Sequence, residues 1–303
     1  MAFLLLTGAA TVQPSSRLMA WPSPAEVHVE AAAAPAQQAQ FPKATLQPAA
    51  VKAPDIPFTD YEFQSEAQLL ALANQSRRQA GAPPLTLDAG LSQAARKHAL
   101  AMLSAQQLSH QFNGEPSLPI RLASTTLLQL DQEGENVALD YDAQHGHEHL
   151  MLSPPHRANL LNPAYNVIGL GVVRSGDRLY IVQDFGHALP NYSPAQVKER
   201  IVAAVNQTRL QASVAQLERR DLPAADNDAC SMAQADKLGT PPVRKLAERA
   251  TVLTYTSLHP ETLPAGAVHA IASRTLHSFS VGACYSRTDT YPTGVYWVVL
   301  SLE

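Results

Sequence analysis

Gly134-Glu135-Asn136-Val137-Ala138 and, from residue 153, Ser-Pro-Pro-His-Arg-Ala-Asn-Leu-Leu-Asn are the stretches that decide the fold of this chain of 303 residues. They bring an acid, Glu135, and a histidine, His156, into one segment. Ser153 is typical of a helix N-cap, and the proline that follows it suits the first helical position. Buried acids and imidazoles are costly unless they are paired or used. This segment is therefore the first candidate for a functional site.

A β-hairpin is predicted directly downstream of these stretches. The apolar pattern of residues 167–173 and the run at residues 179–182 favour two strands, and Ser175-Gly176-Asp177 supplies the turn between them. A polar segment that leads into a hairpin is a common place for a site on a small sheet.

Two helices are predicted upstream. The first has an apolar face at helical spacing that also carries an asparagine; its members are Phe63, Ala67, Leu70 and Asn74. Asp88 is placed to cap the second helix, and we expect His98 on that helix to be a core or rim histidine rather than a ligand. Helices on both faces of a small antiparallel sheet make a three-layer α-β-α sandwich.

Seven segments in order resemble the bacterial members of the CAP superfamily, the cysteine-rich secretory, antigen-5 and pathogenesis-related proteins. They are LLALANQSRRQAG from residue 69, LTLDAGLSQAARKHALAM from residue 85, Ser109-His110, Arg121, GENVA, SPPHRANLLN, and the pair IGLGVV and YIVQDFG. The resemblance covers roughly residues 60–190. It implies an α+β fold of the three-layer α-β-α type for residues 58–192.

The resemblance also implies a cavity lined by two histidines and two acidic residues. His110 matches the first histidine of the family, Glu135 the glutamate of the GEN motif, and His156 the second histidine. The fourth position departs from the pattern, because Ser153 stands where many relatives have the acid. Glu148 lies nearby in the sequence and is the candidate to replace it.

Two chemical interpretations of this set remain open at this point. Imidazoles and carboxylates gathered by the fold are a plausible set of ligands for a divalent metal such as zinc. The alternative is a polar network in which Glu135 holds a histidine by charge-assisted hydrogen bonds. Ser153 is not expected to be a nucleophile, because its role as a cap is sufficient and the chain has no Gly-x-Ser-x-Gly elbow.

Three further histidines, at positions 145, 147 and 149, precede Ser153. His145 and His149 share a face if the stretch is helical. The zinc-protease signature that begins at His147 fails, because its second histidine would be residue 151, which is methionine. We expect an exposed, histidine-rich start of a helix here.

Composition excludes some partners and favours export. The net charge is -4 and the chain has no run of Lys and Arg, so nucleic acid and anionic membrane surfaces are not expected as partners. No apolar run reaches the ~20 residues of a transmembrane span. Residues 1–21 resemble the apolar core of a signal peptide without its basic start, or are a chance apolar N-terminus. Residues 22–57 are rich in Ala, Pro and Gln, which predicts a disordered linker.

A second unit is predicted at residues 195–303. Val205-Asn206-Gln207-Thr208-Arg209 echoes Ala73-Asn74-Gln75-Ser76-Arg77, and a Gly-containing hairpin follows again at the end of the chain. These echoes favour a smaller, degenerate copy of the first domain that lacks the GEN and SPxHR segments. The alternative is an unrelated α+β domain of similar composition. The only two cysteines, Cys230 and Cys284, lie in this unit and predict one disulfide, the alternative being two separate buried thiols.

The resulting hypothesis for function is a secreted or periplasmic binding module rather than an enzyme. Its partner is expected to be a small or lipid-like ligand or a component of the cell envelope. A hydrolase that acts on an envelope polymer or peptide through His110, Glu135 and His156 is the first alternative. A structural adhesion domain is the second, and fold analogy does not decide among the three or give the oligomeric state.

Overall fold

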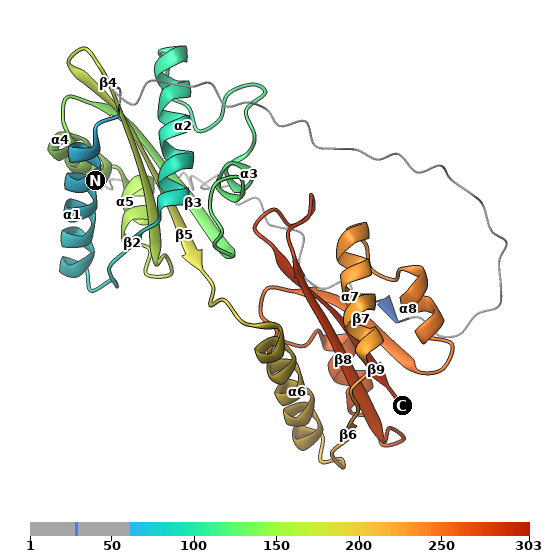
Figure 1. The fold of residues 1–303 in the computed structure, drawn as a ribbon. Helices are drawn as coiled ribbons and strands as arrows, with labels where there is room; N and C mark the ends of the chain where they lie inside the picture. The colour runs from blue at the N-terminus through green and yellow to red at the C-terminus, as the bar shows by residue number, and fades with distance from the viewer. Residues whose placement is uncertain (1–27, 30–60) are drawn as a thin grey trace, which may run out of the picture.

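The computed structural model describes residues 28–29 and 61–303 (Figure 1). Two α/β units follow one another along the chain. The elements of the first unit are α1 (Phe63–Gln79), β2 (Thr86–Leu87), α2 (Ala89–Ala105), α3 (Leu118–Ala123), β3 (Leu130–Asp140), α4 (Ala143–Leu152), α5 (Pro154–Leu161), β4 (Val167–Ser175) and β5 (Arg178–Ala188). The predicted hairpin is therefore formed by β4 and β5, with strands longer than the apolar runs alone indicated.

The first unit has the predicted three layers. Its sheet has the strand order β2-β4-β5-β3, in which β2 pairs with β4 in parallel and the other neighbours are antiparallel. α1, α4 and α5 cover one face, and α2 and α3 cover the other. Side chains alternate between the faces, so Leu170 and Val172 pack in the layer of α1 and α4, whereas Val173 packs against α2. β3 lies at an edge of the sheet, which matters for the site.

α1 turns a different face to the core from the one predicted. Its buried residues are Glu66, Leu69, Ala73 and Arg77, whereas Phe63 is exposed. The two charged members are buried because each has strong partners. Glu66 accepts two hydrogen bonds from Arg96, and Arg77 donates to four main-chain carbonyl groups. The predicted face was wrong because helical spacing of apolar residues does not detect a buried face on which two of the four residues are charged.

α2 follows its prediction closely. Asp88 accepts a hydrogen bond from the backbone N–H of Leu91 at 2.7 Å and so caps the helix. Gly171 of β4 lets the helix approach the sheet, because a Cβ at this position would lie 2.2 Å from a backbone atom of Ala95. His98 is buried on this helix, as expected.

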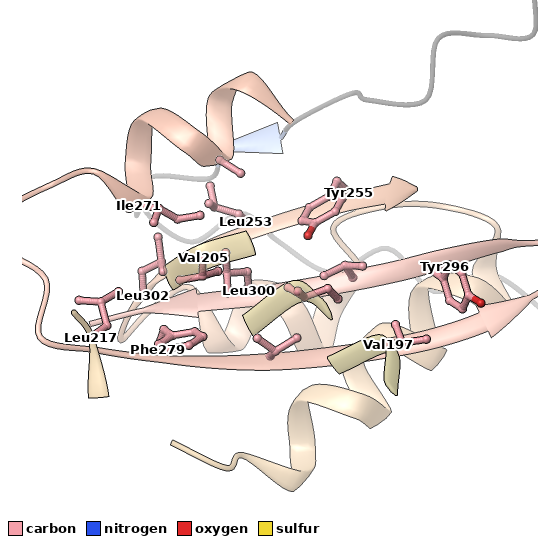
Figure 2. Close-up of a cluster of buried hydrophobic side chains, with 14 residues drawn as sticks. Val197, Val205, Leu217, Leu253, Tyr255, Ile271, Phe279, Tyr296, Leu300 and Leu302 are labelled. Carbon is pink, nitrogen blue, oxygen red and sulfur yellow. The ribbon is translucent and has the colours of Figure 1, made fainter. Parts of the chain in front are cut away.

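The second unit repeats this order in a smaller form. Its elements are α6 (Pro194–Gln211), β6 (Glu218–Arg219), α7 (Pro223–Ala235), α8 (Pro241–Leu246), β7 (Thr251–Ser257), α9 (Ala265–Ile271), β8 (Ser278–Ser286) and β9 (Val295–Leu302). The order β6-β8-β9-β7 matches β2-β4-β5-β3, including the one parallel pair. Figure 2 shows the core on the α6 and α9 side, where Val205, Ile271, Phe279 and Leu300 meet.

The two ladders can be compared residue by residue. Gly282 of β8 lies against α7 as Gly171 of β4 lies against α2. Counted along the paired strands from these glycines, Val252 stands at the place of Glu135, and Ser301 stands at the place of Asp184. The second unit therefore lacks the acidic pair of the first. Between its second and third strands, β7 and β8, it has α9 where the first unit has α4 and α5.

A disulfide joins Cys230 of α7 to Cys284 of β8, so the predicted pairing is confirmed and the alternative of two free thiols is wrong. The bond ties a helix to the sheet of the second unit. Cys284 occupies the place that Val173 has in the first unit.

The predicted signal peptide at residues 1–21 lies outside the described residues, and so does most of the predicted linker at residues 22–57. Within that linker, His28–Val29 form strand β1, which pairs antiparallel with β7. The prediction of disorder does not hold for these two residues. Within the described residues, none of the helices is both long and apolar enough to cross a bilayer.

Candidate functional site

The candidate site is built around Glu135, which lies on the edge strand β3. Its side chain is on the face of the sheet covered by α2, the same side as Val137. Only 4% of the side chain is exposed. A carboxylate so deeply buried needs strong partners, and the surrounding elements supply them.

Two cationic or potentially cationic groups hold the Glu135 carboxylate. His110 Nδ1 lies 2.9 Å from Glu135 Oε1, and Arg121 Nη2 of α3 donates to Glu135 Oε2. Arg121 also donates from Nη1 to the main-chain oxygen of His110 at 2.9 Å. Arg121 thus fixes both the acid and the loop that carries the histidine. The His110 side chain itself remains 60% exposed.

His98 of α2 also contacts the loop that carries His110. Its Nδ1 lies 2.7 Å from Glu115 Oε1, and its Nε2 lies 2.8 Å from the main-chain oxygen of Ser109. Nε2 is also 3.8 Å from Glu135 Oε2. The expectation of a core histidine was therefore right, but this histidine also positions the residue before His110.

Asp184 of β5 stands directly opposite Glu135 in the ladder and is fully buried. No N–H donor among the described residues contacts either of its carboxylate oxygens. Burial, and then the negative charge of Glu135, raise the pKa of Asp184 well above its ordinary value. The protonated form of Asp184 is therefore favoured beside Glu135.

His156 lies on α5, which covers the other face of the sheet. Asn136 Nδ2 donates to the main-chain oxygen of His156 at 3.1 Å, and Asn159 Nδ2 donates to Asn136 Oδ1 at 3.0 Å. This amide chain anchors α5 to the edge strand. Because β3 is an edge, side chains from both faces can meet around it.

The two histidines have opposite pKa shifts. The hydrogen bond with Glu135 raises the pKa of His110 above its ordinary value of 6.5. Burial, and then the charge on His110, lower the pKa of His156 below 6.5. The site therefore pairs one imidazole whose pKa is raised with one whose pKa is lowered.

The two less certain candidates do not join this cluster. Glu148 is exposed on α4 and accepts a hydrogen bond from Gln144 Nε2 at 2.7 Å. Ser153 stands at the N-cap position of α5 as predicted, but its side chain makes no capping hydrogen bond. The roles of His110, Glu135 and His156 as a functional site remain a prediction.

Sequence reasoning assigned no role to three important members of the cluster. Arg121 and Asp184 fell inside quoted motifs, and Glu115 was not considered. An aspartate in the apolar strand after residue 179 was the one available signal, since an isolated acid in a buried strand demands a partner.

A divalent metal does not fit the residues present. Both oxygens of Glu135 are already engaged, one of them by the cationic Arg121. Over residues 61–303, no group of three or more His, Cys, Asp or Glu side chains is arranged to hold a metal ion. The geometry is that of the polar network, the second of the two interpretations.

Comparison with known proteins gives one family. Residues 70–185 match the family model CAP, described as "Cysteine-rich secretory protein family". The protein YkwD of Bacillus subtilis (strain 168), described as uncharacterized, is 32% identical over 115 residues, which are 37% of this chain. The match spans 43% of the length of that relative.

Two solved structures resemble the first unit. One is an extracellular protein containing a SCP domain from Bacillus anthracis str. Ames, 27% identical, with a TM-score of 0.38 over 42% of this chain and 41% of the other. The other is an outer surface protein from Borrelia burgdorferi, 17% identical, with a TM-score of 0.39 over 42% of this chain and 94% of the other.

Proposed function

We propose, from the premise that residues 70–185 are a domain of the CAP family, that this chain is an exported binding module whose ligand contacts His110 and His156. The observation that carries the proposal is a contrast in exposure. The His110 side chain is 60% exposed, whereas Glu135, which holds it, is 4% exposed. The buried carboxylate of Glu135 holds the exposed imidazole of His110 in place. Stability of the fold alone does not require this arrangement, because burying a charge is costly.

The chemistry of the exposed edge indicates the class of ligand. His110 Nδ1 is engaged by Glu135, so its Nε2 faces the ligand, and His156 adds a second imidazole whose pKa is lowered by burial. Leu108 and Ile120, near His110 in sequence, are 43% and 48% exposed. Polar groups beside apolar ones suit an amphipathic ligand. We propose a lipid-like molecule or another envelope component, rather than a metal ion.

Export is supported by the disulfide of the second unit. Disulfides form and persist in oxidising compartments and are rare in the cytoplasm. A secreted or periplasmic location follows as part of the proposal, and family membership agrees with it.

Co-sedimentation tests the binding function. Purified protein is mixed with phosphatidylglycerol vesicles, phosphatidylcholine vesicles or insoluble peptidoglycan, and the bound fraction is measured. We expect saturable binding to one of these probes, and its loss in the double variant H110A/H156A. His269→Ala, at an exposed histidine of the second unit, is the matched control and should bind as the unaltered chain does. Equal binding by H110A/H156A would refute the site.

A hydrolase is the second candidate, and one observation favours it. An imidazole whose Nδ1 is held by a carboxylate and whose Nε2 is free has the arrangement of a general base. No described serine contacts His110, so the nucleophile would be water. Release of soluble fragments from peptidoglycan by the unaltered chain, and none by H110A that still binds, would replace the binding proposal with this one.

A purely structural adhesion role is the third candidate. The second unit favours it, because its ladder has Val252 and Ser301 where the first has an acidic pair. Unchanged adhesion by H110A/H156A, together with no binding to any probe, would support it.

A further inference from the structure

A pair of histidines on α4 lies outside the cluster around Glu135. His145 and His149 are one helical turn apart, and their side chains are 57% and 63% exposed. Residues four apart on a helix are neighbours on its surface. Two histidines with this spacing are also the arrangement by which a helix binds zinc in metalloproteases.

Each of these imidazoles is held by a carboxylate through the same ring nitrogen. His145 Nδ1 lies 2.8 Å from Asp142 Oδ2, and His149 Nδ1 lies 2.6 Å from Asp140 Oδ2. A carboxylate at Nδ1 fixes the tautomer in which Nδ1 carries the proton and Nε2 carries the lone pair. Neither Nε2 has a partner among the residues that the structure describes. Both histidines therefore present a free, oriented nitrogen ligand to solvent.

The local charge suits a cation. Asp140, at the end of β3, and Asp142, the N-cap of α4, face the two rings, and Glu148 lies on the same helix. The guanidinium of Arg178 is engaged with Tyr141, to whose hydroxyl group it donates and on whose ring it stacks. Arg121 donates to the Glu135 carboxylate. Within the described part of the chain, no arginine is hydrogen-bonded to the carboxylates of Asp140 and Asp142.

Helix stability does not explain His145. The N-terminal turn of a helix disfavours positive charge, and Asp142 already caps α4 through the backbone N–H of His145 at 2.9 Å. A histidine at this position adds nothing to the cap. Its carboxylate-held geometry is better explained by a ligand at Nε2.

We propose that His145 and His149 form a surface site for a divalent transition-metal ion such as Zn²⁺ or Ni²⁺, with water completing the coordination. Imidazole suits both metals. Asp140 and Asp142 are positioning residues that orient the ligands. The site is separate from the proposed binding site around His110 and does not depend on it.

Isothermal titration of the full chain with Zn²⁺, and separately with Ni²⁺, tests the proposal. We expect saturable binding of one ion per chain, lost in His145→Ala and in His149→Ala. Asp142→Asn should weaken the affinity by about 10–100-fold, since it keeps both ligands and removes only the support of one. His187→Ala is the matched control, because His187 Nδ1 is also held by a carboxylate, that of Asp131 at 2.6 Å, but on strand β5, and the neighbouring His259 has its Nε2 3.4 Å from that same carboxylate. It should bind as the unaltered chain does.

His145 is exposed, so His145→Ala is expected to fold, and an unchanged circular dichroism spectrum verifies this. Absence of saturable binding in the unaltered chain would overturn the proposal. So would the same affinity in His145→Ala and the unaltered chain. An unchanged affinity in Asp142→Asn would overturn the positioning role of the carboxylates.

Discussion

Glu135 and Asp184 face one another across β3 and β5, yet the structure treats the two carboxyl groups differently. Arg121 and His110 both stabilise a negative charge on Glu135, and no donor among the described residues remains for Asp184. Two adjacent buried carboxyl groups cannot both ionise cheaply. Glu135 has partners for its charge and Asp184 has none, so the burial of Asp184 costs stability.

That cost predicts the effect of Asp184→Asn. In the unfolded chain Asp184 has its ordinary pKa, whereas in the folded chain its pKa is raised by burial and by the charge of Glu135. The folded state therefore loses stability as pH rises from the unfolded pKa toward the folded one. The asparagine variant is neutral in both states. We expect its free energy of unfolding to exceed that of the unaltered chain by at least about 1 kcal/mol at pH 8, measured by urea denaturation.

The difference should vanish near pH 3, where the unfolded aspartate is protonated as well. Asp140→Asn is the control, because Asp140 is also buried but accepts hydrogen bonds from His149 and from the backbone N–H of Tyr141. It should destabilise the protein. A destabilised Asp184→Asn at pH 8 would contradict the account of a protonated Asp184.

The opposite shifts of His110 and His156 give a second prediction. A nuclear magnetic resonance titration of the imidazole protons should place the midpoint of His110 above 6.5 and that of His156 below 6.5. Glu135→Gln should lower the midpoint of His110, because the hydrogen bond to the carboxylate is the main cause of its shift. It should leave His156 below 6.5, because burial is the main cause there. Midpoints in the reverse order would rule out this geometry.

Part of this cluster could be predicted from the sequence, because His110 and Glu135 match positions in a recognisable family. The partner of Glu135 in the ladder could not. Asp184 lies far along the chain, and a shift of one residue in register would place it on the other face of the sheet. Alternation of apolar and polar residues does not fix that register when the acid itself is buried.

Buried charged residues also limited the prediction of the helices. α2 was predicted well because a capping aspartate and an apolar face agree. α1 was assigned the wrong face because Glu66 and Arg77 are buried with their partners, which come from Arg96 and from main-chain groups distant in sequence. The buried face of a helix is inferred from the spacing of its apolar residues. Charged residues on that face therefore make it look like the solvent-exposed one.

The packing of helix on sheet gives the third prediction, which concerns Gly171 and Gly282. A Cβ at Gly171 would lie 2.2 Å from a backbone atom of Ala95, and one at Gly282 would lie 2.0 Å from a backbone atom of Ala225. Both contacts are with backbone, so the helix must move. We expect Gly171→Ala and Gly282→Ala each to lower the free energy of unfolding by about 1–3 kcal/mol, measured by chemical denaturation.

Gly176 provides the control for these variants. It lies in the turn between β4 and β5 with φ +60°, and a Cβ there would meet nothing within 4 Å. Asparagine tolerates this conformation, so Gly176→Asn should change stability much less. Equal losses of free energy of unfolding in all three variants would show that Gly171 and Gly282 are not required for the close approach of α2 and α7 to the sheets.

At the scale of the whole molecule, the chain has two units in which four strands follow the same order, with different chemistry, and β1 adds a further strand to the second sheet. The repetition extends to single residues. Arg77 at the end of α1 and Arg209 at the end of α6 are both buried, and both donate to main-chain carbonyl groups at the C-terminal end of another helix, α5 and α9 respectively. We propose that residues 195–303 arose by duplication of residues 58–192 and lost the acidic pair, since Val252 and Ser301 need no compensating charges.

The two units also contact one another through polar groups. Arg287 of the second unit donates to the main-chain oxygens of Ala123 and Leu128 in the first. Thr293 Oγ1 donates to the main-chain oxygen of Leu130 at 3.1 Å. Leu130 begins β3, so the second unit supports the strand that carries Glu135.

The disulfide gives the last prediction, because it stabilises only one of the two units. Cys230 and Cys284 are 54 residues apart, and closing a loop of that length restricts the unfolded chain by about 4 kcal/mol. The first unit has no cysteine. We expect reduction, or the variant C230S/C284S, to destabilise the second unit by roughly this amount and to split thermal unfolding into two transitions. Binding by the first unit should persist between the two transition temperatures. A single transition displaced as a whole would instead mean that the contacts from Arg287 and Thr293 make the two units unfold as one.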